Sequence, residues 1–519
     1  MKLLKSTATV GVATLTSRIL GFIRDMVFAR YFGASAETDA FFLAFKIPNF
    51  MRRLFAEGSF SLAFVPVLSE VRASGDARAL KDLIDHVAGT LAGILLIVTA
   101  IGVLAAPVVL AIFAPGWLIE GRPEFWLSAG MLRITFPYIL LISLTALAGG
   151  ILNTFDRFMV PALTPVLLNV SLIAAAVLFS GRMEVPITAL AWGVLAAGVA
   201  QLSIQIPALM HLGLLPRPRW GWRHSGMRKI LRLMIPTLVG SSVAQINLML
   251  DAVIATFLIS GSVTWLYYSD RLLEFPLGVF GVALSTVILP NLSRKFAAQN
   301  PQAFSATLDW ALRLAVIITI PAAAGLMILA TPILITLFQY QAFLLSDVEM
   351  SALSLSAYAI GLPAFIAVKV LAPGFYARQD TKTPVKIAIT AMVSNMVLNF
   401  LFVGTLLAIE FKGPHTGLAL ASSAAAYINA GLLYRRLRIM KAYSPEPGWL
   451  RVSLAVLLAT IAMITGLFWQ YGDISEWASA AAFDRSSRLI LLIVLGAAIY
   501  GLVLFVGGLR KHHLEKGAS

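Results

Sequence analysis

Residues 89–113 read GTLAGILLIVTAIGVLAAPVVLAIF, an uncharged and almost entirely apolar stretch. A helix rises about 1.5 Å per residue, so about 20 such residues cross the ~30 Å hydrocarbon layer of a bilayer. Strands of a membrane barrel would instead alternate apolar and polar residues. The stretch therefore predicts a transmembrane α-helix.

The same composition continues along all 519 residues, of which 59% are hydrophobic. The mean hydropathy of +0.86 exceeds what the core of a soluble protein absorbs. Apolar stretches of spanning length recur fourteen times, with predicted limits 5–32, 36–70, 85–114, 125–153, 160–180, 186–212, 228–259, 264–293, 307–338, 348–376, 384–408, 414–439, 449–470 and 486–508. We predict an all-α polytopic membrane protein with fourteen transmembrane helices.

Composition also limits the chemistry. The chain has no cysteine and only six histidines, so we expect no disulfide, no metal site, no cofactor and no catalytic residues. The net charge of +15 comes mostly from basic residues in the predicted loops. That pattern indicates membrane topology and attraction to anionic membrane lipids, so nucleic acid is not an expected partner.

Basic residues are distributed unevenly among the predicted loops. Even-numbered loops and both chain ends hold most of them, including the segment PRPRWGWRHSGMRK at 216–229. Odd-numbered loops hold few, namely Arg122, Arg182, Lys412 and Arg485. Because cytoplasmic loops carry the positive charge in membrane proteins, both termini are predicted to be cytoplasmic.

An internal repeat relates the two halves of the chain at an offset of 224 positions. The matching pairs are Ser61/Ser285, Pro66/Pro290, Leu68/Leu292, Ser69/Ser293, Gly150/Gly374 and Asp156/Asp380. We predict two six-helix lobes related by a pseudo-two-fold axis along the membrane normal, plus two extra C-terminal helices; this arrangement suits alternating access to a central site. The predicted divisions are an N-terminal lobe (1–215), a cytoplasmic basic linker (216–229), a C-terminal lobe (230–440), and the last two helices with a cytoplasmic tail (441–519).

Charged residues lie inside several of these spans, where lipid makes charge costly. They include Arg18 and Arg24 in the first span, Asp39, Lys46, Arg52, Arg53 and Glu57 in the second, and Asp270, Arg271 and Glu274 in the eighth. Helical spacing allows three ion pairs, Arg18 with Asp25, Arg53 with Glu57 and Arg271 with Glu274. One interpretation is that such pairs only fix helix packing.

The other interpretation is a cationic cavity between the lobes, with Arg24 and Arg52 as its least compensated charges. The planar guanidinium of arginine donates paired hydrogen bonds and keeps its charge when desolvated, which suits phosphate. The cavity therefore predicts an anionic, phosphorylated substrate. Spacing alone does not distinguish phosphate from carboxylate.

Four segments carry a family resemblance: TSRILGFIRDMVFARYFGAS, TDAFFLAFKIPNFMRRLFAEGSFSLAFVPVLSE, YYSDRLLEFPLGVFGVALSTVILP and VKVLAPGFYARQDTKTPVKIAI. They resemble the MurJ (MviN) family of lipid II flippases, within the multidrug/oligosaccharidyl-lipid/polysaccharide (MOP) exporter superfamily. The resemblance implies a flippase in the bacterial cytoplasmic (inner) membrane. It would move lipid II, undecaprenyl-diphosphate-linked MurNAc-pentapeptide-GlcNAc, from the inner to the outer leaflet.

The resemblance also implies site residues and partners. It places Arg18, Arg24, Asp39, Arg52 and Arg271 in the substrate cavity, with Ser17, Glu57, Asp270 and Glu274 close by. The implied partners are lipid II, membrane lipids and other cell-wall synthesis proteins, and the implied state is a monomer. The last two spans would form a groove for the polyprenyl tail; simple packing or a partner interface is an equal alternative.

Other polar residues within spans leave alternatives open. Lys369, in the tenth span, either faces the cavity or reaches toward the cytoplasm. Relatives include members with a sodium site, for which Asp251, Asn395 and Asn399 are the candidates, although one carboxylate and two amides are few ligands for a hard cation. Energy would come from the membrane potential or from a coupled monovalent cation.

Two rival functions share some of these features. Another MOP-type exporter, either a polyprenyl-linked oligosaccharide flippase or a drug antiporter, would share the repeat, but a drug antiporter needs neither two extra spans nor so cationic a cavity. A membrane-embedded glycosyltransferase or ligase would use arginines but usually needs a large outward loop. The predicted odd-numbered loops are short, so we predict a transporter and not an enzyme.

Overall fold

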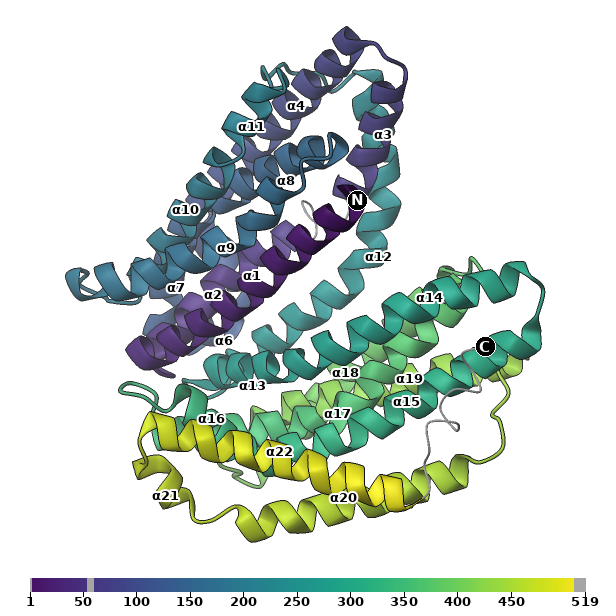
Figure 1. The fold of residues 1–519 in the computed structure, drawn as a ribbon. Coiled ribbons are helices and arrows are strands. Elements are labelled where there is room, and N and C mark those ends of the chain that lie inside the picture. Colours follow the sequence, from purple (N-terminus) through teal and green to yellow (C-terminus); the bar gives the residue numbers. More distant parts are fainter. Residues whose placement is uncertain (1, 54–59, 508–519) are drawn as a thin grey trace. The chain divides into compact units, whose positions relative to one another are not determined.

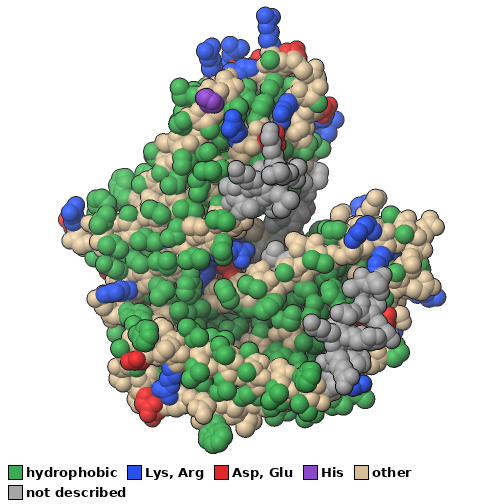
Figure 2. Space-filling model, in the orientation of Figure 1, with side chains coloured by type: hydrophobic (Ala, Val, Ile, Leu, Met, Phe, Trp, Pro, Cys, Tyr) green, Lys and Arg blue, Asp and Glu red, His purple; other side chains and the backbone are tan. Residues whose placement is uncertain are grey.

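The computed structural model describes residues 2–53 and 60–507, and this part of the chain is helical, with no β-strand. Hydrophobic side chains cover most of the face seen in Figure 2, and lysines and arginines gather toward helix ends. An apolar helical surface of this kind matches a lipid environment, because lipid tails do not penalise exposed Leu, Ile and Phe. The prediction of an all-helical membrane protein is confirmed.

Two compact units divide the chain, Met1–Thr264 and Trp265–Ser519. The first contains, in chain order, α1 (Lys2–Phe32), α2 (Ala36–Met51), α3 (Ser61–Ala73), α4 (Ala77–Leu104), α5 (Ala106–Phe113), α6 (Pro115–Ile119), α7 (Pro123–Thr135), α8 (Tyr138–Thr154), α9 (Met159–Ala174), the π-helix η2 (Ala175–Phe179), the 3-10 helix η3 (Ser180–Arg182), α10 (Thr188–Ser203), α11 (Ile206–His211) and α12 (Ser225–Ala255). Figure 1 shows these elements in purple to teal.

The second unit takes up most of α13 (Ser262–Pro276), which begins at the end of the first. It then contains the π-helix η4 (Leu277–Gly281), α14 (Val282–Ala297), α15 (Pro301–Ile328), α16 (Ala330–Phe338), α17 (Leu345–Tyr376), α18 (Lys382–Ala408), α19 (Thr416–Ile439), α20 (Trp449–Gln470), α21 (Ile474–Ser479) and α22 (Ala482–Val506). The pair α20 and α22 lies side by side along α15 and α16 (Figure 1).

Eleven helical segments within the described ranges are long and apolar enough to cross a membrane. The other three predicted spans coincide with α1, with α2 and α3, and with α12. These three are less uniformly apolar, since α1 and α12 carry several charges and α2 ends after 16 residues. The membrane-spanning character is confirmed, and the count of fourteen stays a prediction.

Helix limits recur at the offset of the sequence repeat. Ala77–Leu104 of α4 and Pro301–Ile328 of α15 begin and end 224 positions apart. Each helix starts behind a side-chain cap, because the Asp76 carboxylate accepts from the N–H groups of Arg78 and Ala79, and the Asn300 side chain accepts from that of Ala303. Equivalent sequence positions therefore begin equivalent helices.

A break in the helix occurs at matching places in the two halves. Arg52 and Arg53 are π-helical directly after α2, and the π-helix η4 separates α13 from α14. A π-turn inserts an extra residue into the helix and often accompanies functional positions. Arg52 and Arg53 of the second span lie in the first of these breaks, and Arg271 and Glu274 of the eighth span lie shortly before η4.

The division into units differs from the position of the predicted basic linker. Helix α12 begins at Ser225, inside the predicted linker 216–229, and lies with the first unit, where Met227 and Ile230 join a buried core with Phe64 and Leu83. The two structural units are defined by which helices pack together in this conformation. The predicted lobe boundaries stay a prediction.

Candidate functional site

Arg24 lies at the centre of a buried polar network in the first unit. Its Nε and Nη2 donate to Asp25 Oδ1 at 3.0 and 2.7 Å, and its Nη1 donates to Asn169 Oδ1 of α9 at 3.0 Å. The amide of Asn169 in turn donates to the Ser17 carbonyl at 2.9 Å. Since Arg24 is 6% exposed and Asp25 is fully buried, both charges depend on this network.

The network corrects one predicted pairing. We expected Asp25 to meet Arg18, seven positions away, but Asp25 bonds the neighbouring Arg24. Arg18 is exposed and makes no hydrogen bond or ion pair with any residue in the described ranges. The prediction that Arg24 is poorly compensated was therefore wrong, because spacing along α1 does not reveal the amide that α9 brings to it.

Asn169 is a site residue that sequence reasoning missed. It lies 5% exposed in the apolar run LTPVLLNVSLI of α9. A lone amide inside a membrane span is costly without a partner, so its position was a signal that a polar side chain on another helix faces it.

Arg52 and Arg53 follow the end of α2. The Nε of Arg52 donates to Asn49 Oδ1 at 3.1 Å, and Arg52 is half-buried. Arg53 is exposed. Glu57, the predicted partner of Arg53, lies outside the described residues, so that pairing stays a prediction.

Asp39 holds the connection between α12 and α13, residues 256–261, which we name the α12–α13 connection. Its carboxylate, 2% exposed, accepts from the Gly261 N–H at 2.7 Å, the Thr264 N–H at 2.8 Å and the Thr264 hydroxyl at 2.6 Å. A carboxylate that accepts the first N–H groups of a helix also stabilises its positive end. Asp39 of α2 thus fixes where α13 begins.

Three further contacts hold the α12–α13 connection to α6 and α7. The Gly116 N–H donates to the Thr256 hydroxyl at 3.2 Å, and Ser260 donates to the Glu124 carboxylate at 2.7 Å. The Arg122 Nη1 donates to the Leu258 carbonyl at 2.6 Å. The connection is therefore bonded at both ends and along its length.

Gly116 permits the close approach of α6 to the α12–α13 connection. A Cβ at this position would lie 2.5 Å from the Thr256 carbonyl oxygen, which is backbone and cannot rotate away. We expect Gly116→Ala to displace the connection and to lower transport several-fold. The growth rate of cells that depend on the variant for transport measures the loss. The control is Gly130→Ala, whose added Cβ meets nothing within 4 Å and should leave growth unchanged.

Three charged residues of α13 lie shortly before the π-helix η4, namely Asp270, Arg271 and Glu274. Arg271 Nη1 donates to Glu274 Oε2 at 2.7 Å, which confirms the predicted pair. The two side chains are 32% and 46% exposed, so water or a ligand has access to both. Asp270 beside them is half-buried.

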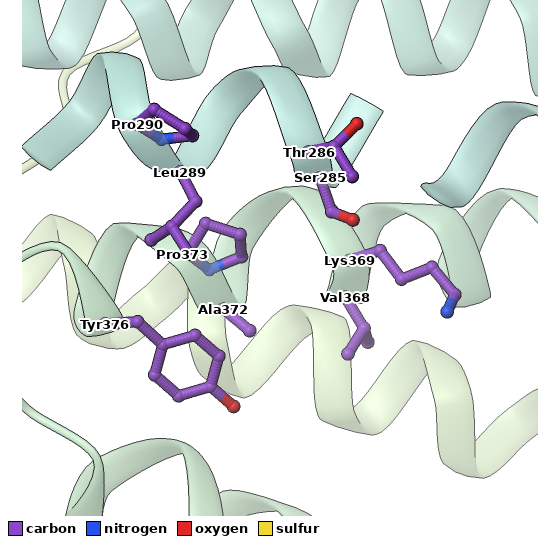
Figure 3. Close-up of a pocket in the computed structure, with 9 residues that line it drawn as sticks. All are labelled: Ser285, Thr286, Leu289, Pro290, Val368, Lys369, Ala372, Pro373 and Tyr376. Atoms are coloured by element: carbon purple, nitrogen blue, oxygen red, sulfur yellow. The ribbon is translucent and has the colours of Figure 1, made fainter. Parts of the chain in front are cut away.

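A cavity of about 520 Å³ opens between α14 and α17 in the second unit (Figure 3). Lys369 lies at one end near Ser285 and Thr286, and apolar groups with Tyr376 line the other end (Figure 3). The lining residues are Ser285, Thr286, Leu289, Pro290, Val368, Lys369, Ala372, Pro373 and Tyr376. One cation and two hydroxyls beside an apolar wall suit an amphiphilic anion.

Gly281 of the helix break supports this position of Lys369. A Cβ there would lie 2.6 Å from Lys369 Cδ, so a larger residue would require the lysine stem to shift. Lys369 is exposed and lines this cavity of the second unit; whether it faces the predicted central cavity stays a prediction.

The three ion-site candidates belong to different units. Asn395 and Asn399 are fully buried in α18 of the second unit, where the Asn399 amide donates to Asn395 Oδ1 at 3.0 Å and the Asn395 amide donates to Ser422 at 3.3 Å. Asp251 is 8% exposed in α12 of the first unit. Their convergence on a cation stays a prediction.

One cluster in the first unit has the residue types of a metal site, Asp82, His86 and His224. The two rings stack with centroids 4.9 Å apart, and each has a nitrogen 3.3 Å from the Asp82 carboxylate. However, His224 Nδ1 accepts from the Gly226 N–H, so the neutral ring carries its proton on Nε2, the atom that faces Asp82. A hydrogen there fits a bond to Asp82 better than it fits a metal.

Comparison with known proteins places the chain in a family. The family model described as "Lipid II flippase MurJ" matches residues 28–485. The chain belongs to the MurJ family. The Vibrio cholerae member, named "Probable lipid II flippase MurJ", is 48% identical over 99% of this chain and 98% of its own. The Burkholderia cenocepacia "Lipid II flippase MurJ" is 41% identical, with 100% of each chain covered.

Solved structures agree with the MurJ assignment. One described as "Lipid II flippase MurJ, inward closed conformation" superposes with a TM-score of 0.79 at 28% identity, covering 95% of this chain and 97% of that chain. An inward-facing multidrug resistance MATE family transporter of the MOP superfamily superposes with a TM-score of 0.65 at 15% identity, covering 82% and 95% of the two chains, which shows a shared fold. The predicted family is confirmed.

Proposed function

We propose that this MurJ-family protein moves lipid II from the inner to the outer leaflet of the bacterial cytoplasmic membrane. The observation that carries the proposal is the 48% identity, over nearly the whole chain, to a relative named as a lipid II flippase. A drug exporter is the weaker candidate, since the multidrug transporter that shares the fold is only 15% identical. Transport of an intact lipid requires no bond to change, which supports a transporter rather than an enzyme.

The proposed substrate site uses accessible cations to bind and buried groups to hold helices in place. Arg18, Arg53, Arg271 and Lys369 are exposed or partly exposed, so their charges are available to a diphosphate. Guanidinium groups replace the water that a diphosphate loses in the membrane. The polyprenyl tail of lipid II would stay in the bilayer during transport, so only the headgroup needs the cationic site.

The buried members of the site act through position. Arg24 ties α1 to α9, Asp39 ties α2 to the start of α13, and the Ser17 carbonyl is bonded to Asn169. A third set of residues would exchange hydrogen-bond or ion-pair partners when the headgroup enters the site. These residues are Arg52, Glu57, Asp270 and Glu274. Arg271 would release Glu274 for phosphate.

Alternating access would act on the α12–α13 connection. The predicted orientation, with both termini cytoplasmic, puts this connection on the outer side of the membrane. Its bonds to Asp39, Gly116, Arg122 and Glu124 then represent a closed outer side. Release of the headgroup outward would require those bonds to break, and re-forming them would reset the transporter.

The finer architecture forms part of the same proposal. Recurrence of helix limits at 224 positions supports two six-helix lobes, 1–215 and 230–440, joined by the linker 216–229 and related by a pseudo-two-fold axis. With α20 and α22 in 441–519 the total is fourteen helices. The last two would carry the polyprenyl tail along their exposed apolar faces, which include Leu457, Leu458 and Leu491.

Energy for transport would come from the membrane potential, which is worth about 2.3 kcal/mol per charge per 100 mV, or from a coupled monovalent cation. The protein is proposed to act as a monomer among other cell-wall synthesis proteins. No cofactor is needed for either energy source.

Depletion of the protein from cells tests the proposed function directly. We expect lipid II to accumulate in the inner leaflet and to disappear from the outer leaflet, measured by its accessibility to an externally added lipid II-binding enzyme. Unchanged outer-leaflet lipid II after depletion would refute the proposal.

Charge reversal at the accessible arginines tests the proposed substrate site. We expect Arg18→Glu and Arg271→Glu each to abolish complementation while the membrane level of the protein stays normal, because an acidic group repels the diphosphate. Arg78→Glu, at an exposed arginine near the start of α4, is the matched control and should complement. Loss of the protein itself would favour a purely structural role for these arginines.

A further inference from the structure

Asp309 of α15 is a buried carboxylate that the transport mechanism above does not use. It is 1% exposed, and its Oδ1 accepts from the Tyr443 hydroxyl at 2.7 Å, the Trp449 indole N–H at 2.7 Å and the Glu446 N–H at 3.2 Å. All three donors lie in or directly after the segment 440–448, which we name the α19–α20 connection. One side chain therefore binds the connection at three points.

Arg313, one turn further along α15, completes the arrangement. Its Nε donates to Asp309 Oδ2 at 2.6 Å, and its Nη2 donates to the carbonyls of Glu446 and Pro447 at 2.9 Å each. Its guanidinium also lies over the Trp449 ring, 5.5 Å from the centroid. The pair thus satisfies both donors and acceptors of the connection, and hydrogen bonds to charged groups are stronger than those between neutral groups.

The groups that donate to Asp309 fit a permanent attachment of the α19–α20 connection to α15. Burial and the adjacent Asp309 carboxylate raise the pKa of the Tyr443 phenol, so its hydroxyl keeps its proton and donates. Gly448 precedes α20 with φ of +101°, a conformation that favours glycine. Trp449 then begins α20 directly beside Asp309.

A second carboxylate occupies the equivalent position in the first unit. Asp85 of α4 lies 224 positions before Asp309 and is 4% exposed. Its Oδ1 accepts from the Arg217 N–H at 2.7 Å and from Lys81 at 2.6 Å, and Lys81 also donates to the Leu215 carbonyl at 2.6 Å. Each repeat thus uses the same helix position to bind the segment that leaves it.

The two helices that follow Asp309's connection have further polar attachments to α15 and α16. The Tyr500 hydroxyl of α22 donates to the Ile317 carbonyl at 2.6 Å. Arg485, 8% exposed at the start of α22, donates to the carbonyls of Gln339 and Ile335 at 3.1 and 3.4 Å. The hydrogen bonds described above therefore join α20, α22 and the α19–α20 connection to residues 309–339.

We propose that Asp309 is a positioning residue that keeps the α19–α20 connection on α15 throughout transport, so that α15, α16, α20 and α22 move as one rigid body. Asp85 has the corresponding role for the segment that leads to α12. The inference rests on the proposed lipid II transport. In that proposal α20 and α22 carry the lipid tail, and the Asp309 contacts attach these helices to the C-terminal lobe.

A reversible cross-link tests the proposal, because the natural chain has no cysteine. Ser305 of α15 and Ser444 of the connection are in direct contact, with Ser305 Oγ 2.8 Å from the Ser444 nitrogen and 3.1 Å from its carbonyl oxygen. The double variant Ser305→Cys/Ser444→Cys is reconstituted in vesicles containing lipid II and bridged with a short reducible bis-thiosulfonate. Each single cysteine variant is the matched control.

Bridging should leave lipid II translocation within about two-fold of the unbridged protein, because the connection already stays in place. Asp309→Ala in the same background should lower translocation about tenfold, the equivalent of ~1.4 kcal/mol in the barrier to translocation. Bridging should restore it, and reduction should remove the rescue. Restoration by a covalent tether separates positioning from any direct role of the carboxylate.

Three results would overturn the proposal: a bridge that blocks translocation until it is reduced, a bridge that fails to rescue Asp309→Ala, or cysteines that do not bridge at all. If Asp309→Ala does not accumulate, Asp309→Asn enters the same comparison. Failure of the proposed function is distinguishable, since the unmodified chain would then not translocate lipid II in these vesicles.

Discussion

Asp39→Ala is expected to abolish complementation while most of the protein still reaches the membrane. The substitution leaves the buried N–H groups of Gly261 and Thr264 without their acceptor, each at a cost of roughly 1–3 kcal/mol. Other bonds to Gly116 and Glu124 remain, so the helices stay folded while the α12–α13 connection loosens. A transporter whose outer side no longer closes cannot reset for another headgroup.

Labelling of a single cysteine measures this loosening. Ser262 is fully buried at the start of α13, so Ser262→Cys should react slowly with a membrane-impermeant maleimide added outside the cell. Adding Asp39→Ala should increase its reaction at least several-fold. Glu37→Ala removes an exposed carboxylate two positions away and should change neither labelling nor growth. If labelling stays slow while transport is lost, Asp39 does not act through the connection.

Arg24→Ala is expected to have the second large effect, on stability as well as transport. It removes the cation bonded to the fully buried Asp25 carboxylate, and breaking a buried ion pair in this way costs roughly 3–5 kcal/mol. The Asn169 side chain also loses its donor. A lower melting temperature in detergent and a lower membrane level should both be measurable. Arg133→Ala, at an exposed arginine of α7, should cost less than about 0.5 kcal/mol.

A double variant separates the two roles of Arg24. Arg24→Met with Asp25→Asn removes both charges of the buried pair and retains most of the packing volume, so stability should largely return. Transport should stay impaired if the guanidinium or the exchange of its partners serves the headgroup. Normal transport by the double variant would show that Arg24 has only a packing role.

Much of the site was predictable one helix at a time. The Arg271–Glu274 pair follows from a spacing of three positions on one helix, and the structure has it. The charged residues of the second and eighth spans were recognisable because lipid excludes charge. Among them, Arg52 and Arg53 are π-helical, and Glu274 lies three positions before the π-helix η4. These features depend only on local spacing and on the bilayer as solvent.

Partners on other helices were not predictable in this way. Arg24 was expected to be poorly compensated, but Asn169, 145 positions later, binds it. Asp39 was placed in the cavity by the family resemblance, which stays a prediction, and its three hydrogen bonds go to residues more than 220 positions away. Asp85 and Asp309 lie near predicted span ends and gave no signal of their own, because the connections that they bind lie more than 130 positions away in the sequence.

The sequence by itself determined that the chain is helical, lies in a membrane, is internally repeated and belongs among MurJ-type proteins, because hydropathy, loop charge and motif identity are properties of short segments. Only the tertiary structure decided which buried charges are already satisfied and by which groups. The physical reason is that desolvation makes every buried charge require a partner, while the identity of that partner depends on which distant helix the fold brings within 3 Å.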